Sequence, residues 1–221
     1  MNTTVIGCRK CPRLVRYREK IGRDKVRRFV DWDYWARPLT GFGDRNARLL
    51  ILGLAPAAHG GNRTGRMFTG DSSADFLMRG LHKAGFANQP FSTSKDDELR
   101  LIDAYMTAIV RCAPPANKPT REEISNCNNY LATELRLLPN IRVVLALGRL
   151  AFDTYLWMLR RDGIDTRRYK FRHGALYRVP GTPSYLAASY HPSRQNTQTG
   201  KLSPAMFDRV LRRIRKLTIA R

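Results

Sequence analysis

Four short apolar runs alternate with longer segments of helical periodicity, and this alternation limits the possible folds more than any other feature of the chain. The runs are residues 49–54, 105–110, 141–147 and 185–189. Continuous apolar runs of this length are typical of strands that are buried on both faces, as in a parallel sheet. Parallel neighbours need long crossover connections, which the helical segments can supply. The sequence therefore predicts an α/β fold, a three-layer α/β/α sandwich around a four-stranded parallel sheet.

The segments between the runs carry helix signals. Thr120 and Glu123 form a capping box, in which each side chain can accept a hydrogen bond from an unpaired backbone N–H at the start of a helix. Gly85 suits the C-terminal end of a helix that starts at Ser73. The other predicted helices are residues 149–161 and 204–217, and residues 165–180 are expected to add a β-element. No repeat or Gly/Ser-rich linker divides residues 1–221, so a single domain is expected.

The position of the functional site follows from this architecture. The carboxyl ends of parallel strands meet at one edge of a sheet, and open α/β sheets bind their ligands there. The loops that follow those ends are residues 55–71, 111–119, 148 and 191–200. They hold most of the chain's unusual residues, so we expect the site at this edge.

Basic residues strongly outnumber acidic ones. Forty Lys and Arg side chains against eighteen Asp and Glu give a formal net charge of +22 at pH 7. Residues 9–28 alone hold ten Lys or Arg and two acidic residues. A surplus of this size favours a polyanionic partner, above all nucleic acid. No apolar stretch suits a membrane span, and residues 1–13 lack the apolar core of a signal peptide, so a cytoplasmic protein is expected.

Four cysteines have a spacing that suits metal binding, namely Cys8, Cys11, Cys112 and Cys127. Disulfides are disfavoured in a cytoplasmic chain, so these residues are either reduced core cysteines or metal ligands. Four thiolates suit zinc or an iron–sulfur cluster. The first pair is C-x₂-C, but the second pair is not a zinc knuckle, and this favours a cubane cluster. Such a cluster would tie the basic N-terminal arm to the sheet.

A glycine-rich loop follows the first apolar run. Residues 53–71 read GLAPAAHGGNRTGRMFTGD, and glycines at this density let the backbone pass close to a neighbouring group. The loop lacks the G-K-[ST] of a P-loop and the G-x-G-x-x-G of a dinucleotide-binding turn. It is either a structural Ω-loop or the wall of a pocket, in which Phe68 could stack on a flat base.

Three segments together resemble the family 5 (type B) uracil-DNA glycosylases. They are the glycine-rich loop, the RCAPPANKP segment at residues 111–119 and the YHPSRQNTQTG segment at residues 190–200. The four cysteines resemble the cluster ligands of this family and of its family 4 relatives. The resemblance covers nearly the whole chain, with the segments in the same order. It implies a four-stranded parallel sheet between helices, which agrees with the alternating pattern.

The resemblance also implies a set of site residues. It assigns catalytic roles to Asp75, His191 and Asn117. It forms the base pocket from Gly53, Leu54, Ala55, Pro56, Ala57 and Phe68. It takes DNA contacts from Ser193, Arg194, Gln195, Asn196 and Thr199, and it holds a structural 4Fe–4S cluster with Cys8, Cys11, Cys112 and Cys127. Ala55 stands where other branches carry a water-activating Asp, Asn or Glu, so Asp75 is expected to take that role.

The implied activity is base excision repair by a monomer that flips uracil out of DNA and hydrolyses its glycosidic bond. The small Ala55 could also leave room for other deaminated bases such as hypoxanthine. The alternative that the residues leave open is a non-catalytic iron–sulfur protein that binds nucleic acid. The loops at the strand ends favour the enzyme, because a plain binder needs no pocket. A two-metal nuclease is disfavoured, since only Asp71 and Asp75 stand at the strand ends.

Overall fold

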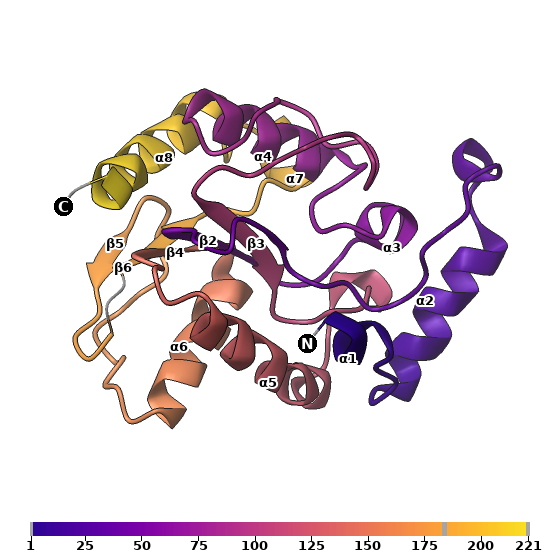
Figure 1. Ribbon diagram of the computed structural model, residues 1–221, viewed down its shortest axis with the longest axis horizontal. Helices are drawn as coiled ribbons and strands as arrows, with labels where there is room; N and C mark the ends of the chain where they lie inside the picture. Colours follow the sequence, from indigo (N-terminus) through magenta and orange to yellow (C-terminus); the bar gives the residue numbers. More distant parts are fainter. Residues whose placement is uncertain (1, 183–184, 220–221) are drawn as a thin grey trace.

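A computed structural model of the chain describes residues 2–182 and 185–219. A six-stranded sheet lies between two layers of helices (Figure 1). The elements in chain order are α1 (Asn2–Ile6), α2 (Pro12–Asp24), η1 (Arg27–Phe29), β1 (Phe42–Gly43), β2 (Leu49–Gly53), α3 (Gly61–Thr64), α4 (Ser72–Lys83), β3 (Ala104–Ala108), η2 (Pro115–Asn117), α5 (Arg121–Leu137), β4 (Val143–Leu147), α6 (Arg149–Arg161), β5 (Leu176–Arg178), β6 (Tyr185–Ser189), α7 (Arg194–Gln198) and α8 (Pro204–Ile219).

The strand order is β1-β3-β2-β4-β6-β5. The middle four strands pair in parallel, whereas β1 and β5 pair antiparallel at the two edges. The sheet is therefore six-stranded and mixed, and not the four-stranded parallel sheet that the sequence predicts. The four predicted strands form its parallel middle. The edge strands are only two and three residues long and are not buried on both faces, so they leave no continuous apolar run in the sequence.

Each face of the sheet carries its own hydrophobic core. On one face α4 and α8 lie side by side (Figure 1), and Phe76 packs on Phe207 between them with ring centroids 5.7 Å apart. A Cβ on Gly80 would lie 2.7 Å from Phe207, so the glycine is what lets these two helices close together. On the other face α5 and α6 bury Leu131 and Phe152 against the sheet. Burial on both faces is what makes the parallel strands apolar at every position.

Two helices begin at residues that fix the position of neighbouring loops. The predicted capping box of α5 is confirmed, because Thr120 accepts a hydrogen bond from the Glu123 backbone and Glu123 accepts one from the Thr120 backbone. Helix α4 starts one residue before the predicted Ser73, and Asp71 is its N-cap. Caps of this kind satisfy backbone N–H groups that have no partner within the helix.

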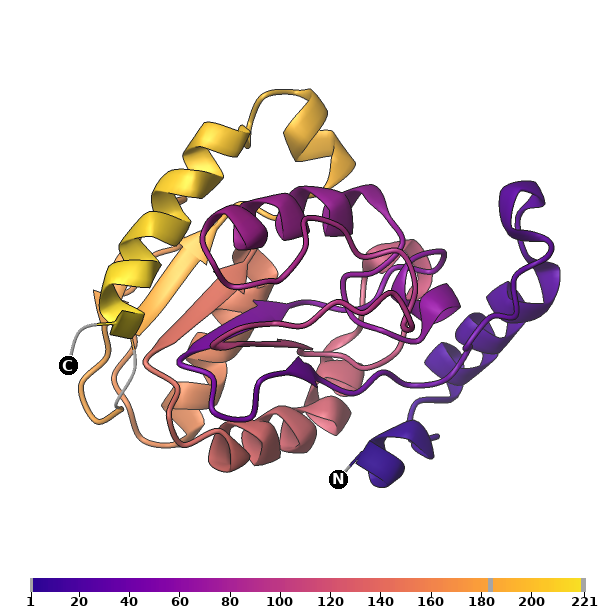
Figure 2. The same ribbon diagram turned by 45° about the horizontal axis from the view of Figure 1, so that its top comes forward.

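The N-terminal arm, α1 and α2, lies beside the sandwich rather than within it (Figure 2). Arg13 of α2 donates two hydrogen bonds to the Glu123 carboxylate of α5, with N···O distances of 2.8 and 2.7 Å. This bidentate ion pair joins the arm to the helix that carries Cys127. Among residues 2–182 and 185–219, no helix is both long enough and apolar enough to cross a membrane.

Candidate active site at the carboxyl ends of the parallel strands

A cavity of about 480 Å³ opens at the edge of the sheet where the parallel strands end. It is lined by Leu54, Ala55, Pro56, Ala57, Gly61, Met67, Phe68, Asp71, Ser72, Ser73, Ala108, Asn117, His191, Ser193, Arg194 and Gln195. The loops after β2, β3 and β6 all contribute. The structure thus brings together most of the residues that the sequence assigns to a base pocket and to DNA.

Four of the expected site residues lie outside this lining. Gly53 ends β2 and lies beneath the Phe68 ring. Asp75 lies one turn into α4. Asn196 donates a hydrogen bond to the His191 carbonyl, with an N···O distance of 2.8 Å, and lines a second cavity that also reaches His191. Thr199 follows α7 and donates its hydroxyl to a carbonyl of that helix.

Asp71 is the cavity carboxylate that the sequence reasoning missed. Its Oδ1 accepts hydrogen bonds from the backbone N–H groups of Ser73 and Ala74, both at 2.9 Å. Its Oδ2 lies against Gly60, where no side chain could fit without a collision. Burial raises the pKa of Asp71 above its usual value, although the two N–H donors oppose this shift. The signal was present in the sequence, since an Asp directly before a helix is a favoured N-cap.

His191 supplies an imidazole that stays uncharged. Burial lowers its pKa from 6.5 to about 4. The ring is therefore neutral at physiological pH, with one nitrogen as a hydrogen-bond donor and the other as an acceptor. Its centroid lies 6.4 Å from that of the Phe68 ring, and the two planes are inclined by 32°.

The low pKa of His191 predicts how stability depends on pH. In the unfolded chain the ring takes up a proton near pH 6.5, whereas in the fold it stays neutral down to about pH 4. Between these values the unfolded state binds more protons, so the unfolding free energy falls as the pH drops through this window and is unaffected above it. We expect His191→Asn to remove this part of the pH dependence in urea unfolding. Equal pH dependence in both proteins would contradict an imidazole that stays neutral in the fold.

Phe68 forms one wall of the cavity from an unusual backbone conformation. Its φ is +47°, in the left-handed region that residues other than glycine rarely adopt. Such strain persists only where the surroundings enforce it, and it is frequent at ligand sites. A Cβ on Gly53 would lie 2.7 and 3.0 Å from two atoms of the Phe68 ring. Gly53 is therefore required for the close approach of this ring to the end of β2.

Replacing Gly53 with alanine should displace the Phe68 ring. The new methyl group would occupy space that the ring now fills, and a displacement of about 1 Å at a reacting centre costs up to roughly a hundredfold in rate. For the base excision that the family resemblance implies, we expect kcat/KM to fall by at least about tenfold. Steady-state kinetics on a duplex with one target base checks this. An unchanged kcat/KM would show that Gly53 does not set the position of the ring.

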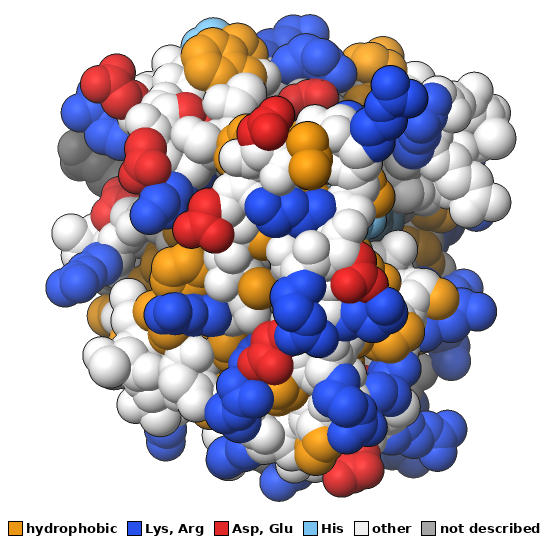
Figure 3. All heavy atoms as spheres, turned by 90° about the vertical axis from the view of Figure 1, so that its right-hand side faces the viewer, with side chains coloured by type: hydrophobic (Ala, Val, Ile, Leu, Met, Phe, Trp, Pro, Cys, Tyr) orange, Lys and Arg blue, Asp and Glu red, His pale blue; other side chains and the backbone are white. Residues whose placement is uncertain are grey.

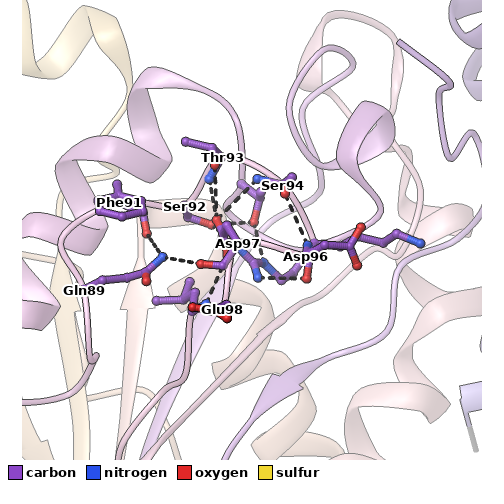
Figure 4. Close-up of polar contacts among 12 residues, drawn as sticks. Gln89, Phe91, Ser92, Thr93, Ser94, Asp96, Asp97 and Glu98 are labelled. Carbon is purple, nitrogen blue, oxygen red and sulfur yellow. Dashed lines mark hydrogen bonds and ion pairs between the residues drawn. The ribbon is translucent and has the colours of Figure 1, made fainter.

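A second loop clamps the segment that carries Phe68. Arg66 forms a buried ion pair with Asp97, with an N···O distance of 2.7 Å. The Asp97 carboxylate also accepts hydrogen bonds from the backbone of Thr93 and Ser94 (Figure 4). Ser92 hydrogen-bonds Thr69 through its hydroxyl, and its carbonyl accepts the Gly70 N–H at 2.8 Å. The Phe68 segment is thus held by a loop about thirty residues further along the chain.

Asn117 reaches the cavity from the loop after β3. Asn117 and Ala116 both have positive φ, at +55° and +52°. Asparagine tolerates this conformation, whereas alanine is strained by it. The turn therefore holds Asn117 at the cavity wall, where the resemblance to family 5 places it.

The four cysteines meet in one small cavity under the N-terminal arm. Cys8 and Cys11 come from the turn between α1 and α2, Cys112 follows β3, and Cys127 lies on α5. All four are free thiols, and burial raises the pKa of Cys112 to about 11 and that of Cys127 to about 12. Within the described part of the chain, no group of three or more His, Cys, Asp and Glu side chains is arranged to hold a metal ion.

Two N–H donors point at the cysteine sulfurs. Arg18 donates to Cys112 Sγ at 2.9 Å, and the Asn126 amide donates to Cys11 Sγ at 3.6 Å. The Arg18 side chain is almost fully buried, so its charge is enclosed together with the sulfurs. Donors of this kind stabilise thiolates and not neutral thiols. These two donors favour the charged form of Cys112 and Cys11, and so oppose the burial that raises the pKa of both thiols.

Comparison with known proteins agrees with this geometry. The model of the uracil DNA glycosylase superfamily matches residues 40–215. A type-5 uracil-DNA glycosylase of Thermus thermophilus is 52% identical over 215 residues, which is 97% of this chain and 95% of the relative. A type-5 uracil-DNA glycosylase of Mycobacterium bovis is 47% identical over 98% of this chain and 80% of the relative. A type-4 uracil-DNA glycosylase of Pyrobaculum aerophilum is 26% identical over 87% of this chain and 81% of the relative.

The family model covers most of the chain, and the type-5 relatives match nearly all of it at about half identity. The match spans the loops that line the cavity as well as the sheet. The resemblance inferred from the three loop segments is confirmed. The chain belongs to the uracil-DNA glycosylase superfamily and, within it, to the type-5 group.

Proposed function

We propose that the chain excises uracil from DNA by hydrolysing the N-glycosidic bond. The observation that carries this proposal is the cavity at the strand ends, which combines an aromatic wall, a neutral imidazole and a half-buried carboxylate. A base inside a duplex cannot reach such a cavity, so the nucleotide must first be flipped out. We also propose that the protein acts as a monomer. Its net charge of +22 would keep it on the nucleic acid of the cell.

Two groups act on the flipped base. Phe68 offers a ring face that replaces part of the stacking lost in the duplex. His191 is neutral and can donate an N–H to a uracil carbonyl oxygen, where negative charge grows as the glycosidic bond breaks. This is the same electrostatic stabilisation that an oxyanion hole provides. Backbone N–H groups of the turn after β2 lie in the same wall and could add donors.

The sugar side of the bond needs a negative charge and a water molecule. Glycosyl cleavage builds positive charge on the sugar, which a carboxylate can stabilise. We assign this role to Asp71 in place of Asp75, because Asp71 lines the cavity and Asp75 does not. Asp71 can also orient the attacking water and accept its proton. The small Ala55 leaves space in the wall, so larger deaminated bases such as hypoxanthine are further candidate substrates.

An excision assay tests the proposed function directly. A labelled duplex with a single U·G pair is incubated with the protein without added metal, and abasic sites are then cleaved. We expect strand cleavage by the wild type and at least about a hundredfold less with His191→Ala, because the donor to the departing base is lost. Binding without excision of uracil or hypoxanthine would favour the non-catalytic alternative.

We also propose a structural 4Fe–4S cluster held by the four cysteines. A cubane takes one thiolate at each of four corners, so its ligands stand further apart than those of a single ion. The donor set fits, since four reduced cysteines line one cavity and two N–H groups point at their sulfurs. When bound, the cluster would fasten the N-terminal arm to β3 and α5. Glycosidic hydrolysis transfers no electron, so the excision residues act independently of its redox state.

Elemental analysis of protein purified without oxygen tests the cluster. We expect about four iron and four sulfide per chain, together with loss of iron in Cys112→Ser. Zinc in place of iron would overturn the assignment. An excision rate that followed the redox state of the metal would overturn the structural role.

A further inference from the structure

A short projection follows α2 and stands beside the base cavity. We define the projection as residues 25–33. In both ribbon views it extends beyond the body of the molecule at the free end of α2 (Figures 1 and 2). The Lys25 ammonium donates to the Val30 carbonyl at 2.9 Å and closes the loop on itself. The uracil-excising residues proposed above leave this segment without a role.

The chain just after the projection is fastened to the loop that forms the cavity wall. The Trp35 N–H donates to the Arg63 carbonyl and the Ala36 N–H donates to the Asn62 carbonyl, both at 3.0 Å. Both bonds run from the segment after the projection to backbone carbonyls of α3. The position of the projection relative to the cavity is therefore fixed by backbone contacts, rather than by exposed side chains.

Arg63 joins the projection to the cavity itself. Its guanidinium lies between two rings of the projection, 3.8 Å from the Phe29 centroid and 4.0 Å from the Trp32 centroid. The same guanidinium donates to the Gly70 carbonyl at 2.8 Å. Gly70 directly precedes Asp71, the carboxylate of the cavity. One buried side chain thus separates the projection from the residues that surround a flipped base.

The projection carries three basic residues, Lys25, Arg27 and Arg28, against the exposed acidic residues Asp31 and Asp33. Arg27 and Arg28 are exposed, and among the described residues neither forms a salt bridge. The Arg28 guanidinium lies 4.5 Å from the Phe29 centroid. Arg23, at the end of α2, is exposed in the same way. On the face that carries α2, Lys and Arg side chains are spread widely and acidic ones are fewer (Figure 3).

One cationic side chain, Arg194, lines the cavity itself, and the projection with Arg27 and Arg28 is joined through Arg63 to the loop on another side of it. Arg194 and Gln195 of α7 line it from the loop after β6. The projection contacts the loop after β2, which also lines the cavity. In the sheet, β2 lies two strands from β6. A DNA strand whose flipped nucleotide enters the cavity must pass between α7 and the projection. Its phosphates would then lie next to the exposed guanidinium groups, which favour phosphate as a bidentate partner.

We propose that Arg27 and Arg28 bind DNA phosphates beside the flipped nucleotide, so that the projection forms a second DNA-binding surface apart from α7. The proposal rests on the excision function above, because it takes the cavity as the place of the flipped base. It assigns to the projection a positioning role on the backbone of the strand and no role in reading the base. Phosphate contacts of this kind hold a protein in register on the duplex.

Salt dependence of binding provides the first test. The probe is a duplex with one stable abasic-site analogue, so the measurement needs no chemistry and can be read even if uracil excision fails. Each phosphate contact adds about 0.9 to the slope of log K against log salt concentration. We expect Arg27→Gln/Arg28→Gln to reduce the magnitude of this slope by about two. When the salt concentration rises from roughly 50 to 200 mM, the variant should therefore lose about tenfold less affinity than the wild type. Arg27→Lys/Arg28→Lys should retain most of the slope, since it keeps both positive charges.

Arg160→Gln/Arg161→Gln is a matched control. This pair is also adjacent and exposed, and Arg161 lies 5.0 Å from the Trp157 centroid much as Arg28 lies over Phe29. It ends α6, at the opposite edge of the sheet from the cavity. We expect the control to leave the slope unchanged. Equal reductions in both pairs would show only diffuse charge and would overturn the proposal, and so would a wild-type slope in the projection variant.

Uncharged replacements for single phosphates can identify which phosphates the projection contacts. Methylphosphonate groups replace the phosphates on either side of the abasic analogue, one position at a time. At a contacted position, the substitution should weaken wild-type binding but should weaken the Arg27→Gln/Arg28→Gln variant little further. Such non-additivity shows direct interaction between the two groups. Additive effects at every flanking phosphate would place the projection against something other than the DNA backbone and would overturn the proposal.

Discussion

Asp71→Asn is expected to lower the single-turnover rate of uracil excision by about a hundredfold, whereas Asp75→Asn is expected to stay within about twofold of the wild type. Asparagine keeps the shape of the side chain and is itself a favoured N-cap, so helix α4 should still begin at the same residue. What it removes is the negative charge and the ability to accept a proton. The measurement is excision from a U·G duplex with enzyme in excess.

The reason for this difference lies in the surroundings of the two carboxylates. Asp71 lines the cavity, its Oδ1 accepts hydrogen bonds from two backbone N–H groups, and its Oδ2 packs against Gly60. A fixed charge in a site that excludes water acts on developing charge far more strongly than one in solvent. Asp75 is absent from the cavity wall, and its charge reaches the site mainly by raising the pKa of Asp71.

Asp75→Asn is the matched control, because it changes the same group on the first turn of the same helix. A loss confined to Asp75→Asn would return the catalytic role to that residue, as the resemblance to family 5 implied. Similar losses in both variants would mean that α4 acts through its overall charge.

The parallel strands could be predicted from the sequence because burial on both faces acts on every residue. Each of the predicted strands contains only buried residues at its centre, so the apolar runs mark them without ambiguity. The edge strands β1 and β5 could not be found in this way. They pair on one side only and remain partly exposed, and their residues follow no apolar pattern.

The site was predictable where its residues follow strand ends, and not where it depends on long-range contacts. Phe68 and His191 were expected in one pocket because their loops leave the same edge of the sheet. Asp71 and Asp75 lie one helical turn apart at the start of α4, and only Asp71 lines the cavity. The position of the loop in the sequence does not show which of the two carboxylates faces the cavity. Phe68 has a left-handed backbone, and its segment is held by the ion pair between Arg66 and Asp97, which lie about thirty residues apart and share no motif.

Glu134→Gln is expected to destabilise the fold by about 3–5 kcal/mol. The buried Glu134 carboxylate accepts two hydrogen bonds from the Arg111 guanidinium, one at each oxygen. The distance from Arg111 Nη1 to Glu134 Oε1 is 3.0 Å. The carboxylate also accepts the Thr107 hydroxyl at 2.6 Å and the Gly41 N–H at 3.2 Å. An amide there leaves the arginine charge buried without a counterion, which costs far more than the loss of a hydrogen bond. The measurement is the unfolding free energy from urea titration.

Glu122→Gln provides the control, since this residue is exposed on the first turn of the same helix, α5, and should change stability by less than about 0.5 kcal/mol. Replacing both partners, in Arg111→Leu/Glu134→Leu, should recover much of the loss, because no charge is then left buried. A loss in Glu134→Gln that the double variant does not recover would mean that the carboxylate acts through Thr107 and Gly41 instead. Arg111 directly precedes Cys112, so the destabilised variant should also lose iron sooner than the control if the cysteines hold a cluster.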